Sequence, residues 1–133
     1  MKTIYLSGPI MYVTPEESIE WRKIAEEKLG KDFIVLNPLR RNFRDCEFLS
    51  TNEIVCFDKA DVKSSDILLV NTERPSWGTA MELFYGHSLG KFVVSFCSEK
   101  NLGSWVIYHS TKCLGSLEEA ISYIKKNFGG DLI

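Results

Sequence analysis

The stretch DILLVNTERPSWGTAMEL, residues 66–83, decides the fold of this chain. Residues 66–71 are the most apolar of the expected strands, and such an uninterrupted run is typical of a strand buried on both faces. From about residue 78 the apolar residues follow a helical period, which Gly90 ends. A buried strand followed by a helix is the repeating unit of a parallel α/β sheet.

The same alternation continues in both directions. Helices are expected over 15–29, 51–63, 78–89 and 116–128, the first with apolar residues at 19, 21, 24, 25 and 29. Buried strands are expected at 3–8, 33–38, 66–71 and 91–97, and 101–115 suits either a short helix or a strand, with a small strand near 112–115. This alternation predicts a single domain over 1–133, an α/β three-layer sandwich of flavodoxin-like or Rossmann-like type with a five-stranded parallel sheet.

Composition and charge exclude some classes of protein. The net charge of −2 gives no electrostatic basis for binding nucleic acid or a membrane surface. The apolar amino-terminal run is broken at residues 7–9, which argues against a signal peptide. The cysteines show no metal-ligand spacing; they are Cys46, Cys56, Cys97 and Cys113. We therefore expect buried free thiols in a cytoplasmic protein.

Ligands of a doubly wound sheet bind beyond the carboxyl ends of the strands, near the point where the strand order reverses. That rule selects the loops 7–14, 37–45 and 71–79. The first loop contains Gly8, which permits a close approach of the backbone to a ligand. It follows Tyr5, whose polar tip interrupts an apolar strand. A tight turn and a core tyrosine are the structural alternative for these two residues.

The second loop contains three guanidinium groups within five residues, those of Arg40, Arg41 and Arg44. A guanidinium group matches phosphate or carboxylate in a bidentate way. The position of these arginines beside the expected cleft favours an anionic ligand. A solvated basic loop is the alternative.

Three aspartates lie between the second loop and the third strand. Asp58 precedes the strand aspartate Asp66 by eight residues, and Asp61 lies between them. We expect Asp61 to face solvent and Asp66 to form a cap or a turn. The direction of the Asp58 side chain is left open by its neighbours in the sequence.

Thr79 and Glu82 match a capping box, T-x-x-E, at the start of the third helix. With Thr79 as the N-cap, the free amides of 80–82 would favour a negative charge and keep Glu82 ionised at neutral pH. An ionised carboxylate beside a sugar is a competent nucleophile or a stabiliser of an oxocarbenium-like transition state. Spacing alone favours the capping role for Glu82, without excluding the catalytic one.

Three motifs together resemble the nucleoside 2-deoxyribosyltransferase superfamily, which includes the 2′-deoxynucleoside 5′-monophosphate N-glycosidases. They are YLSGPI at 5–10, the D-x7-D-I-L-L-V pattern at 58–70, and PSWGTAMEL with a following Gly-Lys pair at 75–91. Their order and spacing agree over about residues 1–95. The resemblance implies a flavodoxin-like fold that cleaves the N-glycosidic bond of a 2′-deoxynucleoside or its monophosphate, without a metal or organic cofactor.

The resemblance also implies a role for each of three side chains. Glu82 attacks C1′ and holds the deoxyribose covalently, Tyr5 orients Glu82, and Asp58 helps to protonate the leaving base. A second base completes the reaction in a transferase, and water completes it in a hydrolase. Such sites borrow residues across subunits, so a homodimer or larger homo-oligomer is expected.

Further residues are expected to contact the substrate. Ser76 matches a serine that contacts the 5′-phosphate in the nucleotide N-glycosidases, and Ser104 matches a second such serine that a neighbouring subunit supplies there. The full expected set is Gly8, Pro9, Ser76, Gly78, Arg40, Arg41, Arg44 and Ser104. The chain departs from the family pattern at four positions: Pro9 replaces a phosphate-binding serine, Trp77 an aspartate, Phe84 a small residue and Phe92 a proline.

We predict deoxyribosyl transfer between bases, with a small-molecule deoxynucleoside or deoxynucleotide as the substrate. A deoxynucleotide N-glycosidase, which is a hydrolase, is the first alternative. A nucleotide-binding sensor, in which the helix start binds phosphate and Glu82 only caps the helix, is an alternative from another class. His109 is expected to be structural.

Overall fold

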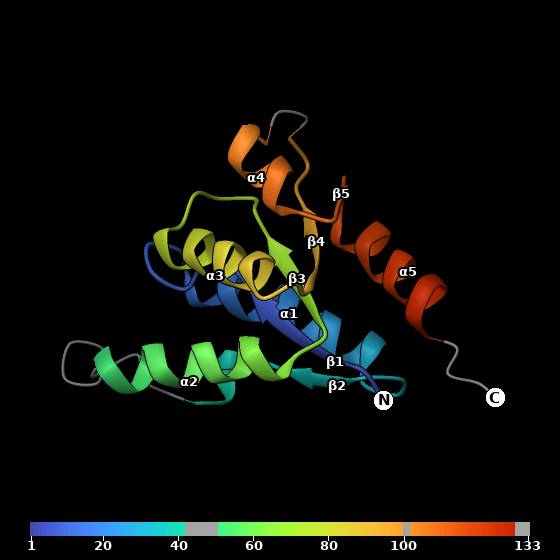
Figure 1. The fold of residues 1–133 in the computed structure, drawn as a ribbon, viewed down its shortest axis with the longest axis horizontal. Coiled ribbons are helices and arrows are strands. Elements are labelled where there is room, and N and C mark those ends of the chain that lie inside the picture. Colours follow the sequence, from blue (N-terminus) through green and yellow to red (C-terminus); the bar gives the residue numbers. More distant parts are fainter. Residues whose placement is uncertain (42–50, 100–101, 130–133) are drawn as a thin grey trace.

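The structure is a computed structural model that describes residues 1–41, 51–99 and 102–129, in which strands and helices alternate (Figure 1). The strands are β1 (Thr3–Ser7), β2 (Ile34–Leu36), β3 (Ile67–Asn71), β4 (Phe92–Phe96) and β5 (Lys112–Leu114). The helices are α1 (Pro15–Leu29), the short 3-10 helix η1 (Pro38–Arg40), α2 (Thr51–Ser64), α3 (Trp77–Ser88), α4 (Ser104–His109) and α5 (Leu117–Phe128). The uncertain segment 101–115 therefore holds both a short helix and a strand.

All five strands pair in parallel, in the order β2-β1-β3-β4-β5. This confirms the predicted five-stranded parallel sheet, and the order is that of the flavodoxin-like arrangement. The chain winds outward from β1 in one direction to β2 and in the other to β3, β4 and β5. The strand order thus reverses between β1 and β3, whose carboxyl ends are the expected place for a ligand.

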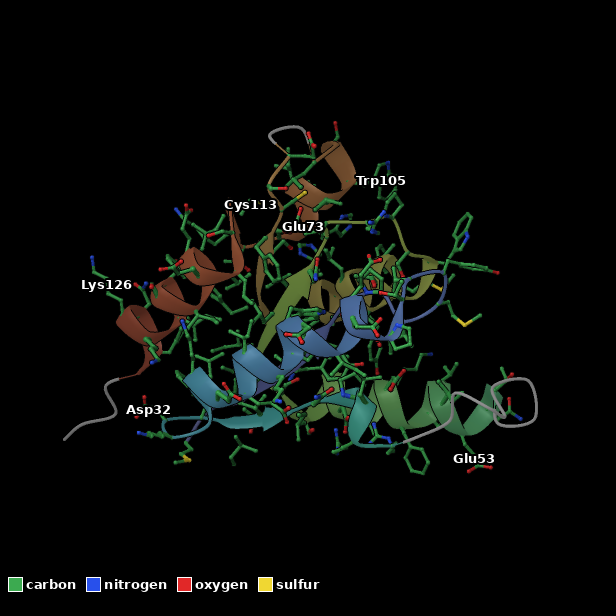
Figure 2. The ribbon with its side chains drawn as sticks, turned by 180° about the vertical axis from the view of Figure 1, so that it is seen from behind. Asp32, Glu53, Glu73, Trp105, Cys113 and Lys126 are labelled. Atoms are coloured by element: carbon green, nitrogen blue, oxygen red, sulfur yellow. The ribbon has the colours of Figure 1, made fainter. Side chains whose placement is uncertain are left out.

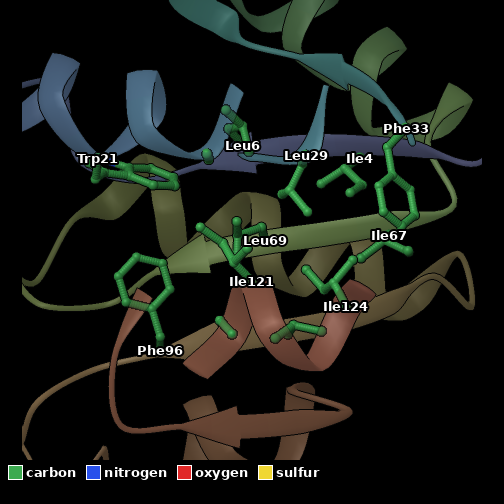
Figure 3. Packing of buried hydrophobic residues seen from close by; sticks show 13 residues of the cluster. Ile4, Leu6, Trp21, Leu29, Phe33, Ile67, Leu69, Phe96, Ile121 and Ile124 are labelled. Atoms are coloured by element: carbon green, nitrogen blue, oxygen red, sulfur yellow. The ribbon is translucent and has the colours of Figure 1, made fainter. Parts of the chain in front are cut away.

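Helices cover the sheet on both faces. On one face, residues of α1 and α5 such as Trp21, Leu29 and Ile121 pack against Leu6 and Leu69 of the central strands (Figure 3). On the other face, a second core joins strand residues to α2 and α3; its buried members are Tyr5, Val62, Leu68, Val70, Leu83 and Val93. Side chains alternate along a strand, so β1 presents Leu6 to the first face and Tyr5 to the second.

Two predicted apolar faces are more exposed than expected. In α1, which begins and ends as predicted, Ile19 and Ile24 are 47% and 37% exposed. The sheet instead buries residues 18, 21, 22, 25 and 29, which form a stripe at helical spacing. The expected buried strand at 33–38 is a three-residue edge strand, and Ile34 is 49% exposed because only β1 pairs with β2.

The prediction of buried thiols is correct for only part of the set. Cys97 is buried, Cys113 is half-buried, and all three described cysteines are free. Cys56 is exposed because its side chain lies on the solvent side of α2, so the prediction is wrong for this residue. Cys46 and Arg44 lie outside the described residues.

Glycines shape both the end and the packing of α3. Gly90 follows the helix with φ of +76°, a left-handed conformation that glycine adopts without strain. At Gly86 a Cβ would lie 2.5 Å from the Leu68 Cδ2 atom, so glycine permits α3 to pack closely on β3. The bulky Phe84 does not occupy this contact; it is 54% exposed and its ring lies 5.2 Å from that of His109.

Among the described residues, no helix has both the length and the apolar character that a membrane span requires.

Candidate active site

Two side chains of β1 and one of α3 meet at the carboxyl end of the sheet. The Tyr5 hydroxyl donates a hydrogen bond to Glu82 Oε2 at 2.6 Å. The Ser7 hydroxyl donates to Glu82 Oε1, also at 2.6 Å. Each oxygen of the carboxylate therefore accepts one strong hydrogen bond, and these two bonds fix the orientation of the carboxylate. This cluster is called the Glu82 site below.

Ser7 is the residue that the sequence prediction missed. It lies two positions after Tyr5 in β1, and residues i and i+2 of a strand share a face. That period would have placed a hydroxyl beside any carboxylate that Tyr5 contacts. The motif drew attention to Tyr5 and Gly8 and passed over the serine between them.

The predicted capping box is wrong. The helix α3 begins at Trp77, and Ser76 is the N-cap, whose hydroxyl accepts from the Thr79 amide at 3.3 Å. The amide of Ala80 already bonds to the Ser76 carbonyl, so it is not a free donor at the helix start. Glu82 lies in the second turn and does not cap the helix. The Thr79 hydroxyl is buried and has no hydrogen-bond partner among the described residues.

Burial determines the protonation of the Glu82 site. It raises the pKa of Glu82 from 4.5 to about 7, the bonds from Ser7 and Tyr5 lower that pKa, and the charge of Asp58 raises it. The expectation that a helix start keeps Glu82 fully ionised is therefore wrong, because desolvation outweighs the favourable contacts. Burial also raises the pKa of Tyr5 far above its usual value, so its hydroxyl remains a donor.

This shift predicts a pH-dependent effect of Glu82→Gln on stability. The folded protein binds the Glu82 proton more tightly than the unfolded chain, so stability is lost as the pH rises from about 4.5 to about 7. A neutral glutamine avoids that loss. We expect the melting temperature of Glu82→Gln relative to the wild-type protein to rise by about 5 °C between about pH 5 and about pH 8.

Glu73→Gln is the matched control, since Glu73 is an exposed carboxylate that accepts two hydrogen bonds from Ser98. Its melting temperature relative to wild type should show the smaller change with pH. Calorimetry at the two pH values that finds no difference between the two variants would contradict the predicted shift.

Asp58 approaches the Glu82 site from α2. It is half-buried, and its Oδ1 lies 3.7 Å from Arg41 Nη2. Burial raises the pKa of Asp58 to about 6, although the charge of Arg41 lowers it. Because the charge of Asp58 affects the pKa values of both Glu82 and Tyr5, the three residues share one electrostatic environment. Two carboxyl groups that titrate near neutrality are typical of a catalytic site.

The arginines of the second loop are paired with an aspartate of α2. Arg40 Nη2 lies 2.9 Å from Asp61 Oδ1, and Arg41 Nη2 lies 2.6 Å from Asp61 Oδ2. The expectation that Asp61 faces solvent is wrong, because these two ion pairs hold it in a position where it is only 7% exposed. The Asp66 side chain accepts from the Thr3 amide at 2.9 Å, so it ties β3 to β1.

The remaining predicted contacts are distributed around the same end of the sheet and beyond it. Gly8 is buried, and a Cβ there would lie 2.6 Å from the Trp21 ring. Gly78 is exposed in the first turn of α3, with open space beside it. Pro9 is buried. Ser104 is exposed in the first turn of α4, and no hydrogen bond within the described ranges joins it to Glu82.

His109 has a structural environment, as expected. Its ring is buried, its Nδ1 lies 2.7 Å from the Trp105 carbonyl oxygen, and it stacks on the Trp105 ring. No three His, Cys, Asp or Glu side chains in the described part of the chain lie close enough together to hold a metal ion. An open surface hollow over β5 and α5, lined by residues such as Ser116 and Tyr123, does not include the Glu82 site.

Comparison with known proteins gives structural matches only. No protein-family model and no curated protein matches the sequence significantly. A 2-deoxyribosyltransferase from Leishmania mexicana has a TM-score of 0.73 and 20% identity, over 96% of this chain and 99% of that one. The chain has the fold of that protein.

Two further structures agree with this result. A 2-deoxyribosyltransferase from Bacillus psychrosaccharolyticus gives a TM-score of 0.71 and 20% identity, over 91% of both chains. A CMP N-glycosidase from Clostridium botulinum gives a TM-score of 0.65 and 18% identity, over 94% of this chain and 98% of that one. The chain thus shares its flavodoxin-like fold, which the motifs predicted, with two 2-deoxyribosyltransferases and a CMP N-glycosidase.

Proposed function

We propose that the protein is an enzyme of the nucleoside 2-deoxyribosyltransferase superfamily, which transfers deoxyribose between bases. The observation that carries the proposal is the Glu82 carboxylate with both oxygens held by hydroxyl donors of β1. This carboxylate lies at the carboxyl end of the sheet, where flavodoxin-like folds bind ligands. The structural likeness to two deoxyribosyltransferases and a CMP N-glycosidase supports the same substrate class.

The first half of the reaction forms a covalent sugar ester. One Glu82 oxygen bonds to C1′ while the C1′–N bond breaks, and the electron pair of that bond stays on the base nitrogen. Asp58 supplies a proton to the base as it leaves. The donors Tyr5 and Ser7 hold the carboxylate so that its remaining lone pairs face the sugar. No metal or organic cofactor is needed for this step.

The second half regenerates the enzyme. A ring nitrogen of an incoming base bonds to C1′, the ester C–O bond breaks, and Glu82 leaves as a carboxylate. Asp58, now ionised, accepts the proton that the incoming base loses. Two displacements at C1′ give net retention of the anomeric configuration.

Product analysis tests the proposed activity. The protein is incubated with deoxynucleosides and with deoxynucleoside 5′-monophosphates, each with and without a second base, and bases and nucleosides are separated by chromatography. Exchange of the base in the presence of an acceptor is the expected result. Absence of both free base and exchanged product with every substrate would contradict an enzymatic role.

Hydrolysis of a deoxynucleotide is the second candidate. It is favoured by the start of α3, where the cap Ser76 and the amides of the first helical residues, Trp77 and Gly78, suit an anion such as a 5′-phosphate. The pairing of Arg40 and Arg41 with Asp61 weakens this candidate, since both cations already have a carboxylate partner. Release of free base from monophosphates without an acceptor would identify the hydrolase.

The sensor alternative assigned only a capping role to Glu82. Ser76 caps the helix instead, and Glu82 accepts bonds from β1. The absence of that capping contact weakens the sensor alternative. The three described free thiols also support a reducing, cytoplasmic location for the proposed enzyme.

We also propose that the protein is a homo-oligomer. Four exposed aromatic side chains and one methionine lie on α3 and α4, and they are called the aromatic face below: Trp77, Met81, Phe84, Trp105 and Tyr108. The two helices pack together through contacts such as that between the His87 and Tyr108 rings. All five side chains are more than half exposed, and Figure 2 shows Trp105 at the edge of the molecule. Large exposed aromatic and methionine side chains of this kind are enriched at protein–protein interfaces. We propose that a second copy of this chain covers the aromatic face in the homo-oligomer.

Light scattering after size exclusion tests the aromatic face. The wild-type chain is expected to elute as a dimer or larger assembly, and the double variant Trp77→Ser/Trp105→Ser as a monomer with unchanged circular dichroism. Ile24→Ser is the control, because Ile24 is an exposed apolar residue on α1. A monomeric wild-type protein, or a double variant that keeps the wild-type mass, would show that this face is not the interface.

A further inference from the structure

Arg22 of α1 is a buried cation that contacts no carboxylate in the part of the chain that the structure describes. Its side chain is 1% exposed, and within the described ranges no carboxylate oxygen lies within 4.0 Å of it. Its guanidinium donates to three backbone carbonyls: Nε to Leu6 at 3.4 Å, Nη2 to Gly8 at 2.8 Å and Nη1 to Ser18 at 2.9 Å. A buried charge held only by neutral groups is costly, so a specific role is expected for it.

Two of the carbonyls that Arg22 binds, those of Leu6 and Gly8, lie on either side of Ser7. The strand β2 pairs with β1 only as far as Leu36, which lies opposite Tyr5, so β1 continues past the end of its neighbour. The Arg22 guanidinium binds this extension, at Leu6 and Gly8. It therefore fixes the backbone from which the Ser7 hydroxyl reaches Glu82.

The charge of Arg22 also acts on the Glu82 site. It lowers the pKa values of Glu82 and Asp58, although burial raises both more strongly. Burial lowers the pKa of Arg22 itself to about 10, so the guanidinium remains charged at neutral pH. Its influence spans the sheet, since α1 lies on the face opposite to α3.

We propose that Arg22 is a positioning residue of the N-glycosidic reaction, which holds the end of β1 through the Leu6 and Gly8 carbonyls and supplies the buried positive charge that favours the ionised Glu82 nucleophile. This inference rests on the proposed function. The other charged or titratable groups that act on Glu82 and its neighbours are Tyr5 on β1, Asp58 and Asp61 on α2, and Arg41 after η1. Arg22 is the member of this group that comes from the opposite face of the sheet.

The test uses two substitutions that separate charge from hydrogen bonding. Arg22→Gln removes the charge and keeps an amide donor, whereas Arg22→Lys keeps a cation and loses the planar fork. In each variant the Glu82 carboxyl is titrated directly by 13C NMR of glutamate-labelled protein, with Glu82→Gln used to assign the signal. This measurement needs no substrate, so it stands even if the proposed activity fails.

We expect the Glu82 titration midpoint to rise in Arg22→Gln and to stay near the wild-type value in Arg22→Lys. In the active enzyme, the pH profile of kcat/KM should shift to higher pH in Arg22→Gln, since the charge of Arg22 lowers the pKa values of both Glu82 and Asp58. In both variants kcat should fall about tenfold or more with KM changed less than about threefold, because the substrate does not touch Arg22. Arg74→Gln is the matched control, since Arg74 is an exposed arginine paired with Glu17 of α1.

Two results would overturn the inference. One is a folded Arg22→Gln protein whose Glu82 titrates as in wild type, which would remove the role of the charge. The other is an Arg22→Lys protein with wild-type kcat and KM, which would show that the guanidinium hydrogen bonds to Leu6 and Gly8 have no role in catalysis. If Arg22→Gln fails to fold, Arg22→Lys still decides the matter, because wild-type kinetics in that variant contradict the positioning role and a fall in kcat with an unshifted acid limb supports it.

Discussion

Glu82→Gln is expected to lower kcat for cleavage of the N-glycosidic bond by about three to six orders of magnitude, with little change in KM. Glutamine has nearly the same shape and can keep hydrogen bonds with Tyr5 and Ser7, so the substrate should still bind. Its neutral amide oxygen cannot displace the base at C1′. The size of the loss follows from removing the atom that forms the covalent bond, because the remaining groups only orient and protonate.

Single-turnover kinetics with a deoxynucleoside measure this effect. Glu73→Gln is the control, since it makes the same change in an exposed carboxylate on the loop after β3 (Figure 2). It should keep wild-type kinetics. A Glu82→Gln enzyme within tenfold of the wild-type kcat would show that Glu82 is not the nucleophile.

Asp58→Asn is expected to lower kcat by about two to three orders of magnitude, the usual contribution of a general acid. The loss should depend on the substrate. A base that leaves readily without a proton should be cleaved nearly as fast as by the wild-type enzyme, whereas a poor leaving group should show the full loss. Comparison of kcat across a series of bases of different acidity measures this dependence.

The pH profile gives a second readout for Asp58. Activity needs an ionised Glu82 and a protonated Asp58, whose pKa values lie near 7 and 6, so the pair should give a bell-shaped profile with its optimum between these values. In Asp58→Asn the basic limb should disappear. The pKa of Glu82 itself should fall in this variant, since the charge of Asp58 raises it.

Asp32→Asn, an exposed loop residue near β2, is the control for both measurements (Figure 2). A uniform loss of kcat across all bases, with both limbs kept, would show that Asp58 is not the proton donor.

The fold was predictable because its signals are local. The first four strands are largely apolar runs and the longer helices have a helical period, so the alternation, the parallel sheet and most boundaries follow from short windows of sequence. The sequence did not decide between the flavodoxin-like and the Rossmann-like strand order. That order depends on the pairing of β1 with both β2 and β3, which are distant from one another in the sequence. The exposure of Ile19, Ile24 and Ile34 likewise depends on which faces the sheet covers.

The start of α3 shows a different limit. Ser76 and Thr79 are both good N-cap residues, and they lie three positions apart, so each can begin the same helix. A motif with the right spacing favoured Thr79, whereas the backbone turns into the helix after Ser76. That shift of three residues moves Glu82 from the cap into the second turn. Because of this shift, Glu82 accepts hydrogen bonds from Tyr5 and Ser7 instead of from the amides at the helix start.

The electrostatics of the site were the least predictable part. Arg40 and Arg41 lie about 20 positions from their partner Asp61 in the sequence, and Arg22 lies 14 positions from Gly8, whose carbonyl it binds. No local pattern in the sequence marks these contacts. The desolvation of Glu82 depends on how α2, α3 and β1 pack together. The motifs singled out Glu82, Tyr5 and Asp58, which the structure brings into one electrostatic environment.

Trapping of the covalent intermediate tests the central role of Glu82 most directly. The protein is mixed with a deoxynucleoside in the absence of an acceptor base, quenched in acid, and analysed by mass spectrometry of the intact chain and of its peptides. We predict a mass increase of one deoxyribosyl group that maps to Glu82 in α3 and is absent from Glu82→Gln. Base release without any such adduct, or an adduct on another residue, would contradict the assignment of Glu82 as the nucleophile.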